Sequence, residues 1–156
     1  MWWFVLKSFH VLFAMLYLGT GIGSAYYKLR AFRSGDLRVI AFFDREIVIA
    51  DWLFTVSSGI VMPATGLTMV LKLQLPLATS WVVTAFALWL VAGLAWLWAA
   101  VLQIRMRNLS AQALGQNQPL PPEYLQAFKL WALLGIPAFL AAMATVVVMV
   151  KKPMLW

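Results

Sequence analysis

Four long apolar runs, separated by short polar segments, dominate the pattern of this 156-residue chain. They cover about residues 2–27, 47–71, 79–104 and 124–150. Each is close to or above the roughly 20 residues that an α-helix needs to cross a bilayer. Apolar runs of this length are typical of membrane-spanning helices rather than of strands. We therefore expect an all-α protein, with residues 1–156 forming a single integral membrane four-helix bundle.

The segments between the runs carry signals that end one helix and begin the next. Residues 34–36, Ser-Gly-Asp, combine a turn with a helix cap. The stretch 37–46 is able to begin the second helix early, on the membrane surface. A short turn is expected at 75–80 and a polar loop at 108–122. The Pro-Pro-Glu sequence at 121–123 should open the last helix.

The composition agrees with a lipid environment. The chain is 64% hydrophobic and 11% charged, whereas about a quarter of the residues of a soluble domain are charged. Its 9 Trp and 4 Tyr include several near the ends of apolar runs, as an interfacial aromatic belt requires. The net charge of +7 flanks the spans, which favours anionic lipid over nucleic acid as the partner.

Basic residues predict the orientation of the bundle. Of the 12 Lys and Arg residues, eight lie in or beside the first and third loops, and the remaining four lie on the opposite side. The positive-inside rule then places both long loops in the cytoplasm and both termini in the periplasm of a bacterial inner membrane. The N-terminal run lacks a basic leader and a small-residue cleavage site, so we expect it to remain as the first span.

His10 is the only histidine, and it lies in the first apolar run. At about 1.5 Å per residue it is roughly 12 Å from the outer surface, a depth shared by Met62 and Met143. A neutral imidazole ligates haem iron or copper, and a His/Met pair is one haem ligand set. His10, with Met62 and Met143, is therefore our candidate site for haem b or copper. A structural histidine that hydrogen-bonds a neighbouring helix is the alternative.

A second polar site is expected nearer the cytoplasmic side. Asp51 shares a helical stripe with Asp44, Thr55 and Ser58. A carboxylate within a span is costly unless it has a partner, and this one could admit protons or lock helices together. The polar groups predicted at its depth are Arg45, Gln103, Arg105 and Arg107.

Other features indicate packing or exclude chemistry. Gly19 and Gly23 form a GxxxG pattern, which permits a homo-oligomer through that face without requiring one. Trp89 and Trp96 fall on one face of the third span and could wall a flat ring. The absence of cysteine excludes disulfides and thiol chemistry. The chain also lacks a Ser/His/Asp set, a phosphate-binding glycine loop and a zinc pattern.

Several motifs, in order along the whole chain, resemble the bacterial integral membrane family DUF2269. They are L-K-x-x-H at 6–10, G-T-G-I-G at 19–23, A-D-W-L-F-T at 50–55, P-x-T-G at 63–66, L-Q-I-R-M-R at 102–107, P-P-x-Y at 121–124 and G-I-P-A-F at 135–139. The resemblance implies a four-span inner-membrane protein and supplies no activity.

The L-K-x-x-H opening is also distantly similar to HemJ-type protoporphyrinogen oxidases and CopD-like copper-resistance proteins. In HemJ-type proteins such a histidine is implicated in haem or porphyrin binding, which the similarity implies for His10. The further histidines of that pattern are missing here. Three functions follow as hypotheses: a haem- or porphyrin-binding redox protein, a copper-binding protein, or a non-catalytic scaffold or accessory subunit.

Overall fold

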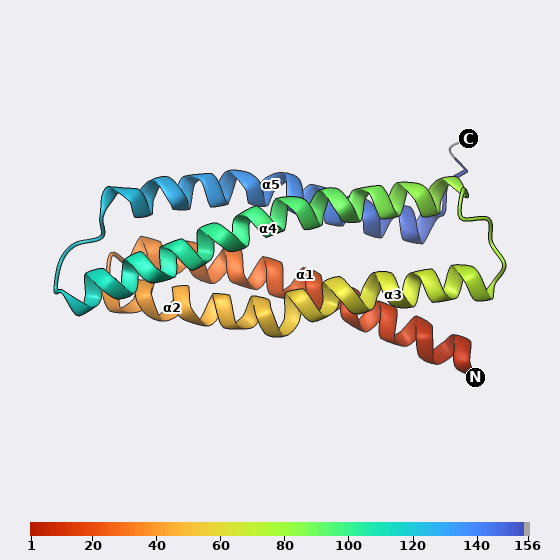
Figure 1. Cartoon of the computed structure of the whole chain (residues 1–156), viewed down its shortest axis with the longest axis horizontal. Coiled ribbons are helices and arrows are strands. Elements are labelled where there is room, and N and C mark those ends of the chain that lie inside the picture. Colours follow the sequence, from red (N-terminus) through yellow and green to blue (C-terminus); the bar gives the residue numbers. More distant parts are fainter. Residues whose placement is uncertain (155–156) are drawn as a thin grey trace.

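The structure is a computed structural model that describes residues 1–154, all of whose regular elements are helical. Helix α1 spans Trp2–Ser34, and a second long helix is built from α2 (Leu37–Ala50), η1 (Asp51–Val56) and α3 (Ser57–Lys72). Helix α4 spans Ser80–Gly115 and α5 spans Pro122–Lys151. These form 4 helices that are long and apolar enough to cross a membrane, as expected for a four-helix bundle (Figure 1).

The helix boundaries confirm most of the predicted signals. Gly35 adopts a left-handed conformation (φ 69°) after α1, which glycine reaches without steric cost. The Asp36 carboxylate then accepts a hydrogen bond from the Arg38 amide at 2.8 Å and caps α2. Helix α2 therefore begins at Leu37, at the early limit of the prediction. Pro122 occupies the first turn of α5, where its missing N–H costs nothing.

The predicted polar loop at 108–122 is wrong in its first half. Helix α4 continues to Gly115, so the connection to α5 shrinks to residues 116–121. The polar residues of this stretch gave it the composition of a loop, but Ser110 and Ala113 are buried on one face of the helix. Packing of that face stabilises helix where composition alone suggested none.

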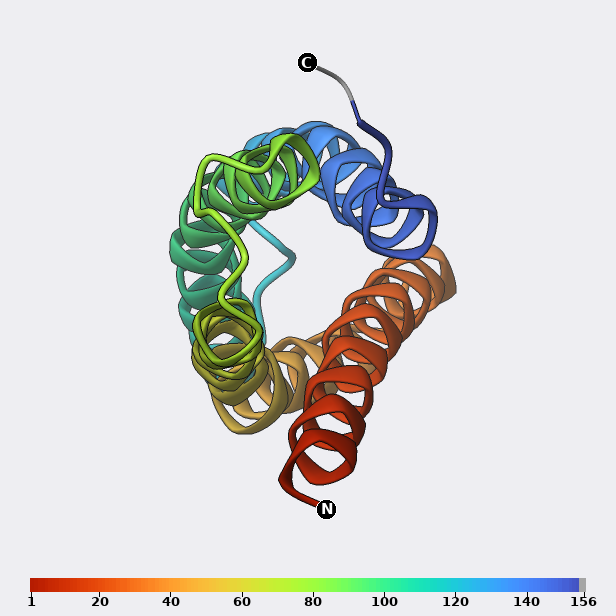
Figure 2. The same ribbon diagram turned by 90° about the vertical axis from the view of Figure 1, so that its right-hand side faces the viewer.

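The helices change neighbours along the bundle. We call the end with Gly35 and the 116–121 loop the basic end, and the end with both termini the terminal end. Near the terminal end α1 lies beside α3, and α4 lies beside α5 (Figure 2). Towards the basic end α4 crosses to pack on α2. There α1 reaches α5 through side chains, since the Phe32 ring stacks on Phe128 with ring centres 4.4 Å apart.

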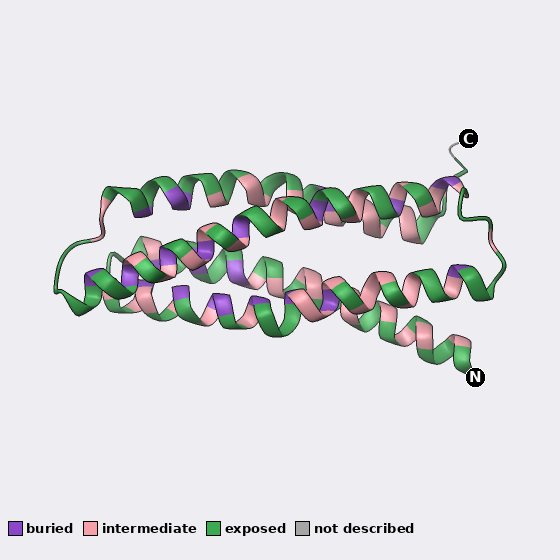
Figure 3. Cartoon of the chain, in the orientation of Figure 1, coloured by how far each residue is buried: buried purple, intermediate pink, exposed green. Residues whose placement is uncertain are grey.

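Most of the buried residues lie toward the basic end (Figure 3). The hydrophobic core there consists of Ile40, Met106, Tyr124, Ala127 and Phe128. Large apolar side chains are exposed along all four helices. Exposure of so many apolar side chains to water would be unfavourable, but in a bilayer they face acyl chains. The fold therefore has a packed basic end and a more loosely packed terminal end.

Candidate functional site

His10 is held on α3 by two polar contacts. Its Nδ1 lies 2.8 Å from the backbone oxygen of Met62 and 3.1 Å from Thr65 Oγ1. A carbonyl oxygen can only accept, so Nδ1 carries the proton and donates it. In the neutral imidazole the other nitrogen, Nε2, then keeps its lone pair. The structure thus fixes both the position and the tautomer of this ring.

The P-x-T-G motif of α3 supplies the surface on which the imidazole rests. Thr65 Oγ1 donates to the carbonyl oxygens of Val61 and Met62, at 2.8 and 3.0 Å, so its lone pairs face the imidazole N–H. A Cβ atom added to Gly66 would lie 3.2 Å from His10 Cε1, which is tighter than an ordinary contact. Glycine at this position lets the ring approach the helix closely.

The two candidate methionines have different relations to His10. The depth estimate correctly paired His10 with Met62, but the contact is made by the Met62 backbone oxygen rather than by its sulfur. The Met143 side chain is 38% exposed on α5. Among residues 1–154, no group of three or more His, Cys, Asp or Glu side chains could hold a metal ion. His10 therefore offers a single nitrogen ligand.

Only part of the predicted Asp51 cluster assembles. Asp51 begins the π-helix η1, and its Oδ1 accepts a hydrogen bond from Thr55 Oγ1 at 2.8 Å. The Gln103 side chain on α4 is its second hydrogen-bonding partner. Asp51 Oδ2 and the hydroxyl of Ser58 are buried without a partner in the described part of the chain. The stripe of Asp51, Thr55 and Ser58 is confirmed as a buried face.

The arginines expected beside Asp51 lie elsewhere. Arg45 and Arg105 are exposed, and Arg45 pairs with its neighbour Glu46 at 3.4 Å. Arg107 donates to the side chain of Asn108. The expectation that an arginine pairs with Asp51 is corrected, because the residues that share its depth point to the surface of the bundle while Gln103 points inward.

A buried ion pair that the sequence analysis missed lies at the basic end. Lys28 of α1 contacts Asp44 of α2, and both side chains are almost fully buried. Tyr124 of α5 donates to the same Asp44 oxygen at 3.2 Å, and the Lys28 ammonium lies 5.5 Å from the ring centre of Trp131. This cluster joins three helices. Lys28 is one of the eight basic residues that the positive-inside count assigns to the cytoplasmic side. The signal for its burial is that Asp44 and Asp51 share one helical face, since buried carboxylates require partners.

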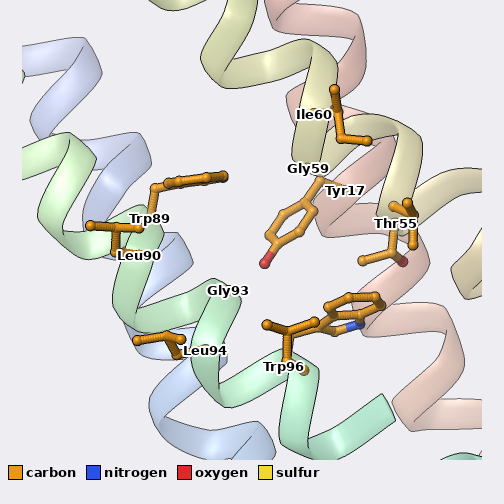
Figure 4. Close-up of a pocket in the computed structure, with 11 residues that line it drawn as sticks. Tyr17, Thr55, Gly59, Ile60, Trp89, Leu90, Gly93, Leu94 and Trp96 are labelled. Carbon is orange, nitrogen blue, oxygen red and sulfur yellow. The ribbon is translucent and has the colours of Figure 1, made fainter. Parts of the chain in front are cut away.

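A pocket of about 240 Å³ lies between α1, the η1–α3 helix and α4. Its polar lining comes from Tyr17 and Thr55, and the indoles of Trp89 and Trp96 flank it, which confirms that these tryptophans share a face. The Tyr17 hydroxyl points into the pocket between the two indoles (Figure 4). Of the candidate site residues, none lines this pocket; Thr55 connects it to Asp51.

A wider groove of about 600 Å³ runs between α1 and α2 and includes Gly19 and Gly23. A Cβ atom added to either glycine would meet nothing within 4 Å. No helix among residues 1–154 therefore packs tightly against the GxxxG face.

Comparison with known proteins identifies the family. The family model described as a predicted integral membrane protein, DUF2269, matches residues 4–153. No curated protein and no solved structure matches the chain. The comparisons lend no support to the more distant similarity to HemJ-type and CopD-like proteins. The match covers nearly all of the chain, which therefore belongs to the DUF2269 family of predicted integral membrane proteins.

Proposed function

We propose that this membrane protein binds a porphyrin, haem b, and that His10 is its axial ligand through Nε2. The observation that supports this is the pair of contacts from Nδ1 to Met62 O and Thr65 Oγ1. Metal-ligating histidines usually donate their other ring N–H to a carbonyl or a carboxylate, which fixes the ring and makes the ligating nitrogen more basic. His10 has this arrangement before any ligand is present.

The residues around His10 determine which groups this chain could supply to a bound haem. His10 is the one histidine of the chain, so this chain would supply a single imidazole ligand to the iron. His10 and the Met62–Thr65 segment of α3 would hold the haem on the α1/α3 side of the bundle. Bound haem would supply one-electron redox chemistry, while this chain would supply the ligand and exclude water.

The test is an absorbance spectrum of the protein purified in mild detergent from haem-replete cells. We expect a Soret band that is lost in His10→Ala. Met62→Leu serves as the matched control, because it removes the thioether but keeps the backbone oxygen that holds His10. Gly66→Ala should weaken the band, since the added methyl group displaces the imidazole.

The same preparation decides between the three hypotheses. Stoichiometric copper without a Soret band, lost in both His10→Ala and Met62→Leu, would replace the haem proposal with a copper site. A colourless, metal-free protein with unchanged folding would overturn both and leave the scaffold or accessory role. In that role His10 serves only to join α1 to α3.

A further inference from the structure

The pocket flanked by Trp89 and Trp96 has the size of one six-membered ring. Its volume is about 240 Å³. An engineered cavity of about 150 Å³ accepts benzene, whereas drug-sized ligands occupy roughly 300–1,000 Å³. A substituted single ring fits between these limits, and a four-ring porphyrin exceeds them. This pocket is therefore distinct from the site proposed at His10.

The pocket has an almost wholly apolar lining with aromatic walls, and its few polar groups come from Tyr17, Thr55 and Trp96. The Tyr17 hydroxyl enters from α1 and makes no hydrogen bond within the described residues. Across the pocket, the Trp96 indole lies with its nitrogen on the side of Thr55 (Figure 4). Pro63 has no N–H to donate to the carbonyl of Gly59, which also lines the pocket. A ring that carries oxygen atoms on opposite sides would find a partner at each edge.

The polar edge beside Thr55 is positioned by Asp51. Thr55 Oγ1 donates its proton to Asp51 Oδ1, so its lone pairs remain free to accept. Asp51 Oδ2 is buried and unpartnered among residues 1–154, and the side chain is 5% exposed. Asp51 is therefore a positioning residue that fixes the hydroxyl of Thr55, a residue that lines the pocket.

The remaining wall of the pocket opens towards the bilayer. Leu90, Leu94 and Leu97 of α4 line it, and each is 44–60% exposed on the lipid-facing surface. A molecule dissolved in the acyl chains can enter past these leucines without crossing water. A hydrocarbon substituent on the bound ring can remain in the lipid.

We propose that this pocket binds the ring of a membrane quinone or quinol. The ring stacks against Trp89 and Trp96, which aromatic side chains favour in offset or edge-on geometry. The Tyr17 hydroxyl donates to one ring oxygen of the quinone, and the Trp96 N–H donates to the other. Thr55, whose proton goes to Asp51, can only accept, and so contacts the quinol alone. The proposal concerns binding alone, and it is independent of haem because His10 does not line the pocket.

Duroquinone and durene form a matched pair of probes, because both are six-membered rings with four methyl groups at the same positions and durene has C–H groups where duroquinone has its two carbonyls. Binding is measured by isothermal titration calorimetry in nanodiscs, with empty nanodiscs subtracted. We expect one saturable site for duroquinone and weaker binding of durene. Gly93→Leu should reduce duroquinone affinity at least tenfold, because it fills open space in the pocket.

The controls separate the pocket from general effects. Gly135→Leu places the same side chain in open space on α5, outside the pocket, and should leave the affinity unchanged. Tyr17→Phe should weaken duroquinone about three- to tenfold, as expected for one lost hydrogen bond, and should not affect durene. His10→Ala should retain duroquinone binding even if it abolishes the Soret band, so the two proposals fail independently.

Three results would overturn the quinone proposal. The first is the absence of saturable duroquinone binding to the wild-type protein. The second is an affinity that Gly93→Leu leaves unchanged. The third is equal affinity for duroquinone and durene together with no effect of Tyr17→Phe, which would show that the pocket accepts any apolar ring.

Discussion

Lys28 shows how single side chains join this bundle. Its ammonium group is surrounded by a carboxylate from α2, an indole from α5 and the hydroxyl of Tyr124 nearby. A charge inside a membrane protein is costly, and it is tolerated where a partner of opposite charge lies in direct contact. Neither Lys28 nor Asp44 can therefore be removed alone without leaving an uncompensated buried charge.

Replacement of Lys28 by Met should destabilise the protein by about 3–5 kcal/mol, the range for breaking a buried ion pair. Met retains the length of the aliphatic stem but leaves Asp44 unpaired. The double variant Lys28→Met/Asp44→Leu should recover most of the loss, because it removes both charges. Unfolding in detergent, followed by circular dichroism, measures both effects. A single variant as stable as the wild type would contradict this role.

Some of these residues were accessible to sequence reasoning, and others were not. The depth estimate paired His10 with Met62 because residue counting locates positions along a helix. It could not reveal that the contact atom is a backbone oxygen, because every residue has a backbone carbonyl and the sequence does not show which one is left accessible. Lys28 was read as a surface anchor because a charge near the end of a span is ordinarily one. Its partner Asp44 lies 16 residues away, across a turn.

At the scale of elements, the π-helix η1 is the main irregularity of the second long helix. A π-turn accommodates one extra residue within an α-helix, and such turns are frequent at functional sites. Here it contains Asp51 and Thr55, which are bonded to each other beside the pocket. The hydrophobic pattern gave no sign of it, because the four-residue spacing of Asp51 and Thr55 is equally typical of an ordinary α-helix.

Deletion of Leu53, an exposed residue of η1, should be tolerated. The π-turn then becomes an ordinary α-helical turn, and the helix on either side keeps its orientation. Deletion of the exposed Ile60 in α3 is the matched control. It rotates the following residues by about 100° and removes Met62 and Thr65 from His10.

Thermal unfolding in detergent distinguishes the two deletions. We expect a midpoint close to the wild type without Leu53 and a clearly lower one without Ile60. Equal destabilisation by both deletions would show that η1 is a fixed requirement of the fold rather than an inserted residue.

At the scale of the whole molecule, hydropathy predicted the four helices well, because a bilayer selects for length and apolarity. It did not predict how the helices exchange neighbours, since side chains that face lipid and side chains that face a helix are equally apolar. The packed core and the ion pair both lie at the basic end.

The expected orientation is testable because the chain has no cysteine of its own. Ala78→Cys, in the turn between α3 and α4, should react with a membrane-impermeant maleimide in intact cells. Gln118→Cys, in the loop between α4 and α5, should react only after the membrane is permeabilised. Both positions are exposed, so a difference in labelling reports sidedness rather than burial. The reverse pattern would place both termini in the cytoplasm.

The change of neighbours along α1 has a mechanical consequence. Its C-terminal half is anchored to α2 by an ion pair, whereas its N-terminal half packs mainly against α3, where His10 is hydrogen-bonded and Lys72 lies 5.9 Å from the ring centre of Trp2. The two halves of α1 are therefore held by different kinds of contact: a buried ion pair at the basic end and the His10 hydrogen bonds near the terminal end. Loss of the imidazole contact should therefore loosen the N-terminal half of α1 and leave its ion-paired C-terminal half in place.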